Sequence, residues 1–369
     1  METCVRSDKR SLASYAITPL IVSILFSLMI QPVLRVPNYV LAVKTSDINS
    51  SYSESLLIIT NSDLEEQAIS YSEYRNSTGI RTLYTTVQRI NSTYHGRDLP
   101  ERIRKCINET SKKNSIDYVL IFGDNEMVPT RLVYIPYCNE TTSEALYVES
   151  DLYYADMQMD WDDNDDGLWG DLNHDIVEGV PDLRLGRLPV SNPDEAEIVV
   201  NKIINYENNV KSSSPWFNKI LLLGEDISSC DERSEGEILS NYIQKEYVES
   251  DFTTEKLYES HSNLTVNDVK SQIDEGVGFV SYTGHGNIDN WDFGNGGSYN
   301  INDVSEQNNG YKLPIIVTTA CLSSSFYHTE SIGKKFITKP NGGAIAYLGP
   351  TSLSYIYPGE SVKNGRSGE

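Results

Sequence analysis

Two segments of the chain place a chemically reactive side chain directly after a short apolar run. The segment Phe279–Gly286 puts His285 between two glycines, and the segment Pro314–Cys321 ends on a thiol. Short apolar runs of this kind are typical of strands buried on both faces of a sheet. Because the carboxyl ends of parallel strands open into one crevice, the sequence predicts that His285 and Cys321 meet there.

A cysteine paired with a histidine has the chemistry needed to cleave peptide bonds. The thiolate is the nucleophile, and the imidazole takes its proton and then protonates the leaving amine. We expect the backbone amides of Gly286 and Cys321 to stabilise the oxyanion. Taken singly, each side chain has a plainer explanation, since a free cysteine packs as a small hydrophobe and a Gly-His-Gly turn can simply end a strand. Their occurrence after two successive predicted strands favours the catalytic interpretation.

The elements that must position these side chains form an alternating pattern. A helix is predicted after Ser191, with Pro193 in its first turn, and another over Glu235–Tyr247. Strands alternating with helices predict an α/β fold with a largely parallel sheet. The further apolar runs that we interpret as buried strands are Leu56–Thr60, Tyr118–Gly123, Ile220–Gly224 and Ala344–Leu348.

The length of 369 residues exceeds what one hydrophobic core usually serves, so two subdomains are expected. The Ser- and Pro-containing stretch Lys211–Pro215 interrupts the helix and strand signals and is the predicted boundary. We therefore expect an N-terminal α/β subdomain over residues 56–210 and a catalytic α/β subdomain over residues 216–369. The second subdomain is expected to be incomplete at its C-terminal end.

The first residues carry a targeting pattern. Basic residues precede the apolar run Ala16–Ile30, so residues 1–31 are predicted to be a signal peptide or an N-terminal anchor. Residues 32–55 are polar and are interpreted as a linker or pro-segment. We expect a secreted or cell-surface protein that contacts a membrane only through this apolar segment. Asn-x-Ser/Thr sequons agree with export and begin at Asn49, Asn76, Asn91, Asn108, Asn139 and Asn263.

Charge and cysteine spacing exclude several classes of function. The net charge of −23 would repel a phosphate backbone, so nucleic-acid binding is not expected. The five cysteines include no CxxC pair, which argues against a zinc ribbon or a thioredoxin-type site.

An acidic stretch from Asp160 to Gly167 resembles the opening of a calcium-binding loop, with oxygen donors at alternate positions. The twelfth loop position falls on Asn173 instead of the usual glutamate, so further ligands must come from elsewhere. A structural calcium ion is expected because so many carboxylates repel one another unless neutralised; the alternative is a solvated acidic loop. The candidate ligands are Asp160, Asp162, Asn164, Asp166 and Asp171.

The segments Tyr282–Gly286 and Thr319–Cys321 resemble the histidine and cysteine motifs of the gingipain family of cysteine peptidases. The resemblance extends upstream through Tyr118–Asp124, Tyr153–Asp156 and Pro181–Val190, and covers roughly residues 56–350. It implies a caspase-like fold in which His285 is the general acid and base and Cys321 is the nucleophile.

The same resemblance implies roles for acidic residues before the histidine motif. Glu225 matches the position of an acid that orients the histidine, although a surface or capping carboxylate is the alternative. Among the nearby acids Asp231, Glu232 and Glu235, Glu232 best matches an acid in the pocket for a basic residue, which implies cleavage after Arg or Lys; a solvated charged loop is the alternative. Trp291, which lies between His285 and a glycine-rich loop, is expected to line the substrate cleft or to pack in a core.

We therefore expect an exported cysteine endopeptidase that acts on protein or peptide substrates and is supported by calcium. Two alternatives share the scaffold. A sortase-like transpeptidase would use the same Cys-His dyad, and a calcium-dependent surface adhesion protein would use no dyad at all.

Overall fold

The computed structural model describes residues 54–135, 146–227, 234–326, 330–356 and 359. The predicted signal peptide or anchor and nearly all of the polar segment 32–55 lie outside these residues, as does Glu232. Within the described part of the chain, no helix combines the length and the apolar character needed to cross a bilayer.

The first subdomain is built on a four-stranded parallel sheet in the order β2-β1-β3-β6. Alternate side chains of β1 enter two different cores: Leu56 and Ile58 pack with α2 and α5, whereas Leu57 and Ile59 pack with α3 and α4. The apolar run at 56–60 therefore forms a strand buried on both faces, as predicted. The strands are β1 (Glu54–Thr60), β2 (Ile80–Thr86), β3 (Tyr118–Phe122) and β6 (Arg184–Leu188). The helices are α2 (Glu65–Ser77), α3 (Val87–Thr93), α4 (Leu99–Asn114) and α5 (Pro193–Asn209).

The second subdomain holds a five-stranded parallel sheet in the order β14-β13-β9-β7-β8. Helices α7, α8 and α9 pack on one apolar cluster of this sheet, and α6 packs against β7 and β9. The strands are β7 (Lys219–Gly224), β8 (Thr253–Tyr258), β9 (Phe279–Thr283), β13 (Ile315–Thr318) and β14 (Ala346–Leu348). The helices are α6 (Glu235–Tyr247), α7 (Val266–Glu275), α8 (Ile301–Glu306) and α9 (Ile332–Thr338).

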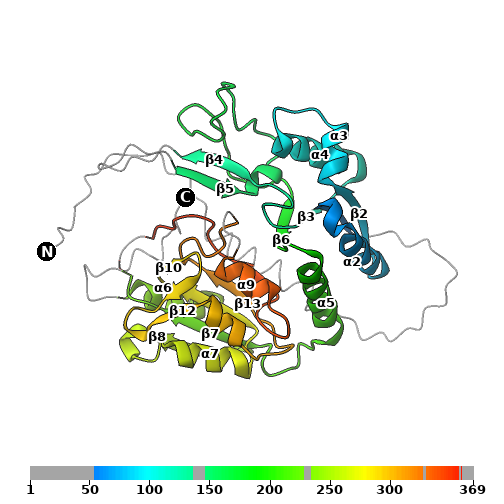
Figure 1. Cartoon of the computed structure of the whole chain (residues 1–369). Helices are drawn as coiled ribbons and strands as arrows, with labels where there is room; N and C mark the ends of the chain where they lie inside the picture. Colours follow the sequence, from blue (N-terminus) through cyan, green and yellow to red (C-terminus); the bar gives the residue numbers. More distant parts are fainter. Residues whose placement is uncertain (1–53, 136–145, 228–233, 327–329, 357–358, 360–369) are drawn as a thin grey trace.

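Two small antiparallel sheets complete the described chain. One joins β10 (Gly286–Asn287), β11 (Asn290–Asp292) and β12 (Ser298–Asn300), and follows β9. The other is the pair β4 (Arg131–Ile135) and β5 (Leu146–Ser150), which extends from the first subdomain toward the second in Figure 1. Short 3-10 helices lie at Ser62–Leu64, Leu152–Tyr154, Glu259–His261 and Gly294–Gly296.

The predicted helix after Ser191 is α5, and its start follows from local chemistry. Asn192 caps it by accepting the Glu195 N–H, and Pro193 occupies the first turn. The predicted helix over Glu235–Tyr247 is α6, with the bounds expected. The stretch Lys211–Pro215 lies between α5 and β7, where one sheet gives way to the other.

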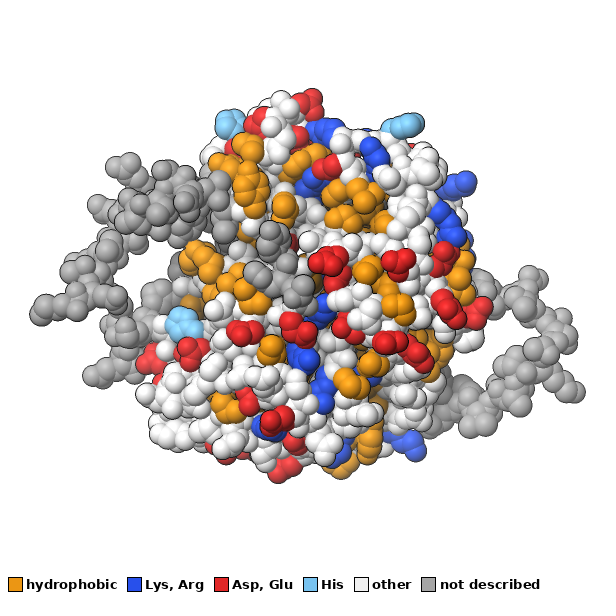
Figure 2. Space-filling view, viewed as in Figure 1, with side chains coloured by type: hydrophobic (Ala, Val, Ile, Leu, Met, Phe, Trp, Pro, Cys, Tyr) orange, Lys and Arg blue, Asp and Glu red, His pale blue; other side chains and the backbone are white. Residues whose placement is uncertain are grey.

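Acidic side chains lie across the middle of the face shown in Figure 2, in both subdomains. This distribution places much of the negative charge on the surface, where solvent screens it.

Buried polar contacts join the two subdomains along α9, which lies beside α5 in Figure 1. Lys334 of α9 forms an ion pair of 3.1 Å with Asp124, at the end of β3, and also contacts Ser191. Lys202 of α5 donates to the carbonyl oxygen of Ile337 at 2.8 Å, near the end of α9. Burial alone would raise the pKa of Asp124, but the hydrogen bond from Ser191 and the charge of Lys334 hold it below its usual value.

The substitution Lys334→Met is expected to lower the free energy of unfolding at pH 7 by about 3 kcal/mol, because it leaves Asp124 buried without its cation. The difference from the wild type should shrink as the pH falls through the depressed pKa of Asp124, where the carboxylate becomes protonated. Urea denaturation over a range of pH measures both effects. Lys335→Met is the matched control, since Lys335 forms only a partly exposed pair with Glu330. Equal losses in the two variants would contradict the role of the buried pair.

Candidate active site

Three adjacent parallel strands bring the predicted catalytic residues to one edge of the second sheet. In the pairing of β9 with β13, Tyr282 lies opposite Thr318, and the N–H of Thr319 donates to the carbonyl of Tyr282 at 3.1 Å. His285 and Cys321 each follow one of these two paired residues by three positions. They therefore leave neighbouring strands at the same level, as the two apolar runs predicted.

The turn that carries His285 packs closely against the segment that carries Cys321. A Cβ atom added at Gly286 would lie 2.7 Å from the Cβ of Ala320. Contacts this short are not tolerated between real side chains, so this close approach requires glycine at position 286. The glycine that was expected to supply an oxyanion amide thus also lets the two segments meet.

Cys321 is partly buried and is a free thiol. Its Sγ accepts the N–H of Ser354 at 3.3 Å and lies 3.5 Å from the carbonyl oxygen of the same residue. The next residue, Leu322, has a φ of 59°, which is unusual for a side chain larger than glycine. Its N–H donates to the carbonyl of Ser352 at 2.9 Å, which helps to hold this bend. The thiol is therefore presented on a constrained turn.

Glu225 follows β7 and is only 3% exposed. Its Oε2 accepts the backbone N–H of His285 at 2.5 Å and the hydroxyl of Tyr282 at 3.1 Å. Gly284 is needed beside it, because an added Cβ would lie 2.5 Å from that oxygen. Burial raises the pKa of Glu225 to about 7, and the amide and charge of His285 oppose the rise.

The imidazole of His285 is exposed, and its Nε2 lies 3.2 Å from the carbonyl oxygen of Ile227. Glu225 thus contacts the main chain of His285, and the imidazole ring meets a backbone carbonyl. Tyr282, for which the sequence predicted no role of its own, also donates to the carbonyl of His285 at 2.8 Å. The sequence feature that could have indicated Tyr282 is its position in the predicted strand, three residues before the histidine.

Trp291 does not line a surface cleft, so the expectation that it lines the substrate cleft is wrong. Its side chain is 0% exposed and stacks with Tyr299 and Phe336, at 5.8 Å and 5.3 Å between ring centroids. Its Nε1–H donates to the hydroxyl of Tyr347 at 2.9 Å, so the polar edge of the ring is also satisfied. Aromatic packing, the alternative, is what the structure shows. The strands β10 to β12 fold the tryptophan back into the core.

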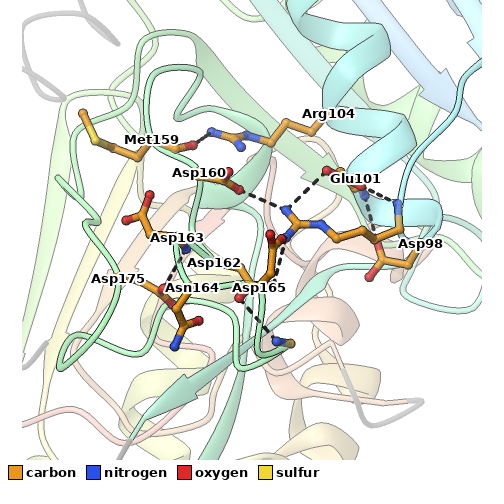
Figure 3. Close-up of polar contacts among 12 residues, drawn as sticks. Asp98, Glu101, Arg104, Met159, Asp160, Asp162, Asp163, Asn164, Asp165 and Asp175 are labelled. Atoms are coloured by element: carbon orange, nitrogen blue, oxygen red, sulfur yellow. Dashed lines mark hydrogen bonds and ion pairs between the residues drawn. The ribbon is translucent and has the colours of Figure 1, made fainter.

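A guanidinium lies among the carboxylates of the acidic loop, as Figure 3 shows. Arg97 forms ion pairs of 2.9 Å with Asp160, 2.9 Å with Asp162 and 2.8 Å with Asp165. Asp162 is 2% exposed, and its Oδ1 also accepts the N–H of Asp166 at 3.0 Å. Part of the charge repulsion that motivated the calcium expectation is therefore relieved by an arginine from a distant segment.

The remaining predicted ligands make local contacts. The side chain of Asn164 donates to Asp166 at 2.7 Å, and Asp171 lies 2.9 Å from Nδ1 of His174. Among the described residues, no group of three or more His, Cys, Asp or Glu side chains is placed to hold a metal ion. The calcium ion thus stays a prediction.

The family model described as Peptidase family C25 matches residues 49–367. Lys-gingipain HG66 of Porphyromonas gingivalis is 25% identical over 188 residues, which cover 50% of this chain and 11% of that protein. Gingipain R2 of Porphyromonas gingivalis (strain ATCC 33277) is 19% identical over 291 residues, which cover 77% of this chain and 34% of that protein. The chain thus spans about a third or less of the length of these relatives.

The fold is similar to that of a solved cysteine peptidase. The crystal structure of the Arg-specific cysteine proteinase gingipain R superposes with a TM-score of 0.62 at 18% identity. The superposition covers 83% of this chain and 64% of that one. It confirms the predicted caspase-like α/β fold.

The high pKa of Glu225 predicts a pH dependence of stability. Because its folded pKa of about 7 exceeds the ordinary value of 4.5, its stabilising contribution is complete at low pH and is lost as the pH rises through 7. Relative to Glu225→Gln, the wild type is expected to lose about 3 kcal/mol of unfolding free energy between about pH 4 and about pH 8. Chemical denaturation across this range measures the difference.

The matched control is Glu259→Gln, since Glu259 also accepts a backbone amide, that of Asp226, at 3.1 Å. A Glu225→Gln variant with the same pH profile as the wild type would show that the carboxyl group does not titrate in this range.

Proposed function

The chain belongs to peptidase family C25, and from this membership we propose that it is a cysteine endopeptidase that uses Cys321 and His285. The observation that carries the proposal is the adjacency of β9 and β13, from whose ends the two side chains leave at the same level. Protein or peptide chains are the proposed substrates.

The proposed reaction has two steps. In the first, the thiolate of Cys321 attacks the carbonyl carbon of the peptide bond, and His285 gives its proton to the leaving amine. In the second, water attacks the thioester carbonyl while His285 takes a proton from the water, the C–S bond breaks to return the thiolate of Cys321, and the acid product leaves. The amides of Gly286 and Cys321 are the proposed donors to the oxyanion in both steps.

Glu225 is proposed to hold His285 in place through its main chain. The carboxylate fixes the N–H of His285, and Tyr282 fixes its carbonyl, so the two peptide groups of the histidine are both bonded. With the backbone fixed, the imidazole can move only by rotation about its side-chain torsions. This arrangement supports an orienting role for Glu225 that acts on the backbone rather than on the ring.

A preference for basic residues before the cleaved bond is also proposed. It rests on Glu232, which lies outside the described residues, and on relatives whose names specify Arg or Lys. Export to the cell exterior is proposed from the basic and apolar pattern of residues 1–31.

A peptide-library assay tests the function. The full chain is expected to cleave library peptides, with Arg or Lys enriched before the cut, and Cys321→Ala is expected to abolish cleavage because the nucleophile is gone. Cleavage that persists in Cys321→Ala would overturn the proposed mechanism. Products joined to an added amine would indicate the transpeptidase alternative.

Thiol labelling provides the control for this experiment. Iodoacetamide is expected to label Cys321 first at neutral pH, and more slowly in His285→Ala, because an imidazole-paired thiol is the more reactive one. Cys106 is the internal comparison, since it is buried and burial raises the pKa of its thiol. Equal labelling of Cys321 with and without His285 would contradict the dyad and favour a non-catalytic protein.

We propose that the acidic loop binds a structural calcium ion. The support is chemical: oxygen donors at Asp162, Asn164 and Asp166 alternate along the loop, and hard cations prefer such ligands. Such an ion would share the carboxylates with Arg97, which pairs with Asp162.

Removal of calcium by a chelator is expected to lower the melting temperature, because the ion binds only the folded state. At free calcium near 100 times the dissociation constant, the loss is about 2.7 kcal/mol. Differential scanning calorimetry with and without added calcium measures it, and Asp162→Asn should lose the response. A melting curve that the chelator leaves unchanged would rule the ion out.

A further inference from the structure

Glu149 belongs to the first subdomain, yet its side chain bonds the loop that follows Cys321. It lies on β5, in the small sheet that extends toward the second subdomain in Figure 1, and it is 5% exposed. Its Oε2 accepts the N–H of Phe326 at 2.8 Å and lies 3.3 Å from the hydroxyl of Ser325. Both partners follow the nucleophile closely in the sequence, four and five residues after Cys321.

The main chain of Glu149 holds a second segment that touches the thiol. Its carbonyl oxygen accepts the hydroxyl of Thr351 at 2.9 Å. The residues around Thr351 bond the loop in turn: Leu322 donates to Ser352, and Ser324 donates to Pro350, each at 2.9 Å. Two residues beyond Ser352, the N–H of Ser354 reaches Sγ of Cys321. Glu149 and the sulfur are thus both bonded to the short segment 351–354, one at each end.

Phe326 is held from its ring as well as from its amide. The guanidinium of Arg187 lies 5.1 Å from the ring centroid and forms an ion pair of 2.6 Å with Asp151, two residues after Glu149. The same guanidinium donates to the carbonyl oxygens of Gly123 and Val128 at 2.7 Å and 2.8 Å, so it is fixed in the first subdomain. The end of the nucleophile loop is therefore held by two charged groups of that subdomain.

A carboxylate is a costly group to bury, and a neutral side chain could fill the same space. Burial of an ionised group is tolerated where hydrogen-bond donors meet it, and at Glu149 the N–H of Phe326 and the hydroxyl of Ser325 both meet Oε2. Such charge-assisted bonds are shorter and stronger than neutral ones, so they hold the groups they join more firmly. This firmness is what a nucleophile needs, since displacement of a reacting group by about 1 Å costs on the order of 10²-fold in rate.

We propose that Glu149 is a positioning residue for the nucleophile, through which the first subdomain sets the geometry of the Cys321 loop. The inference rests on the proposed function. Glu149 acts through Ser325, Phe326 and Thr351, and it contacts neither the substrate nor the reacting atoms.

The test compares two buried carboxylates that both join the subdomains. Glu149→Ala is expected to lower kcat by about 10²-fold with KM nearly unchanged, because the loop loses its acceptor while substrate contacts stay. Glu149→Gln is expected to recover part of the loss, since its amide oxygen still accepts the N–H of Phe326 but without the charge. Asp124→Ala is the matched control: it loses the contact to Lys334 and should lower the melting temperature while leaving kcat close to that of the wild type. All kcat values are measured below the lowest melting temperature.

The proposal is overturned if Glu149→Ala loses no more kcat than Asp124→Ala, because the effect would then be general destabilisation. Should Glu149→Ala fail to fold, Glu149→Asp replaces it: the shorter carboxylate keeps the charge but withdraws from the N–H of Phe326, and a fall in kcat is again expected. An unchanged kcat in that variant would equally overturn the proposal.

A second readout separates this proposal from the proposed function. If the wild type cleaves no peptide in a Cys321-dependent way, the endopeptidase assignment fails, and the alkylation rate of Cys321 decides the positioning claim. That rate should change in Glu149→Ala and return in Glu149→Gln, with Cys106 as the internal standard. Equal rates in wild type and Glu149→Ala would refute positioning by Glu149.

Discussion

The parallel pairing of β9 with β13 is the constraint on which the site depends. Because Tyr282 and Thr318 lie opposite each other, the next three residues of each strand bring His285 and Cys321 to one level of the sheet. A shift of one residue in this register would move one of them relative to the other and reverse the faces of a whole strand. The pairing of β7 with β9 adds Glu225 by the same geometry. Three separate stretches of sequence thus converge at one edge of the sheet.

Buried polar groups lie where the two subdomains meet. Lys334 pairs with Asp124, Lys202 bonds the end of α9, and Glu149 bonds the loop after Cys321. Such contacts add little net stability, since desolvation offsets much of the attraction. They do require one particular arrangement, because any displacement leaves a charged group buried without its partner. These contacts therefore help to specify the relative placement of the subdomains, because other placements would leave charged groups unpaired.

The sequence was informative where apolar pattern and short motifs decide the structure, and less so where distant residues meet. The runs at 279–283 and 315–318 are strands because they are apolar and short, and the glycines around His285 indicated a turn. Trp291 was less certain, since the hairpins that return it to the core leave no periodic signal. The partners of Arg97 and Glu149 lie far away along the chain, so no local spacing indicates them. The contact of Glu225 with a backbone amide likewise depends on a backbone path that the motif alone does not fix.

The left-handed backbone at Leu322 has a consequence for how this region tolerates sequence change. A non-glycine residue in that conformation costs on the order of 1–2 kcal/mol, which the bonds to Ser352 and Pro350 help to offset. The bend and the segment that braces it are distant in sequence, but the strain of the first is offset by the hydrogen bonds of the second. Homologous chains that alter one of them should therefore show a compensating change in the other, so the two segments are expected to covary.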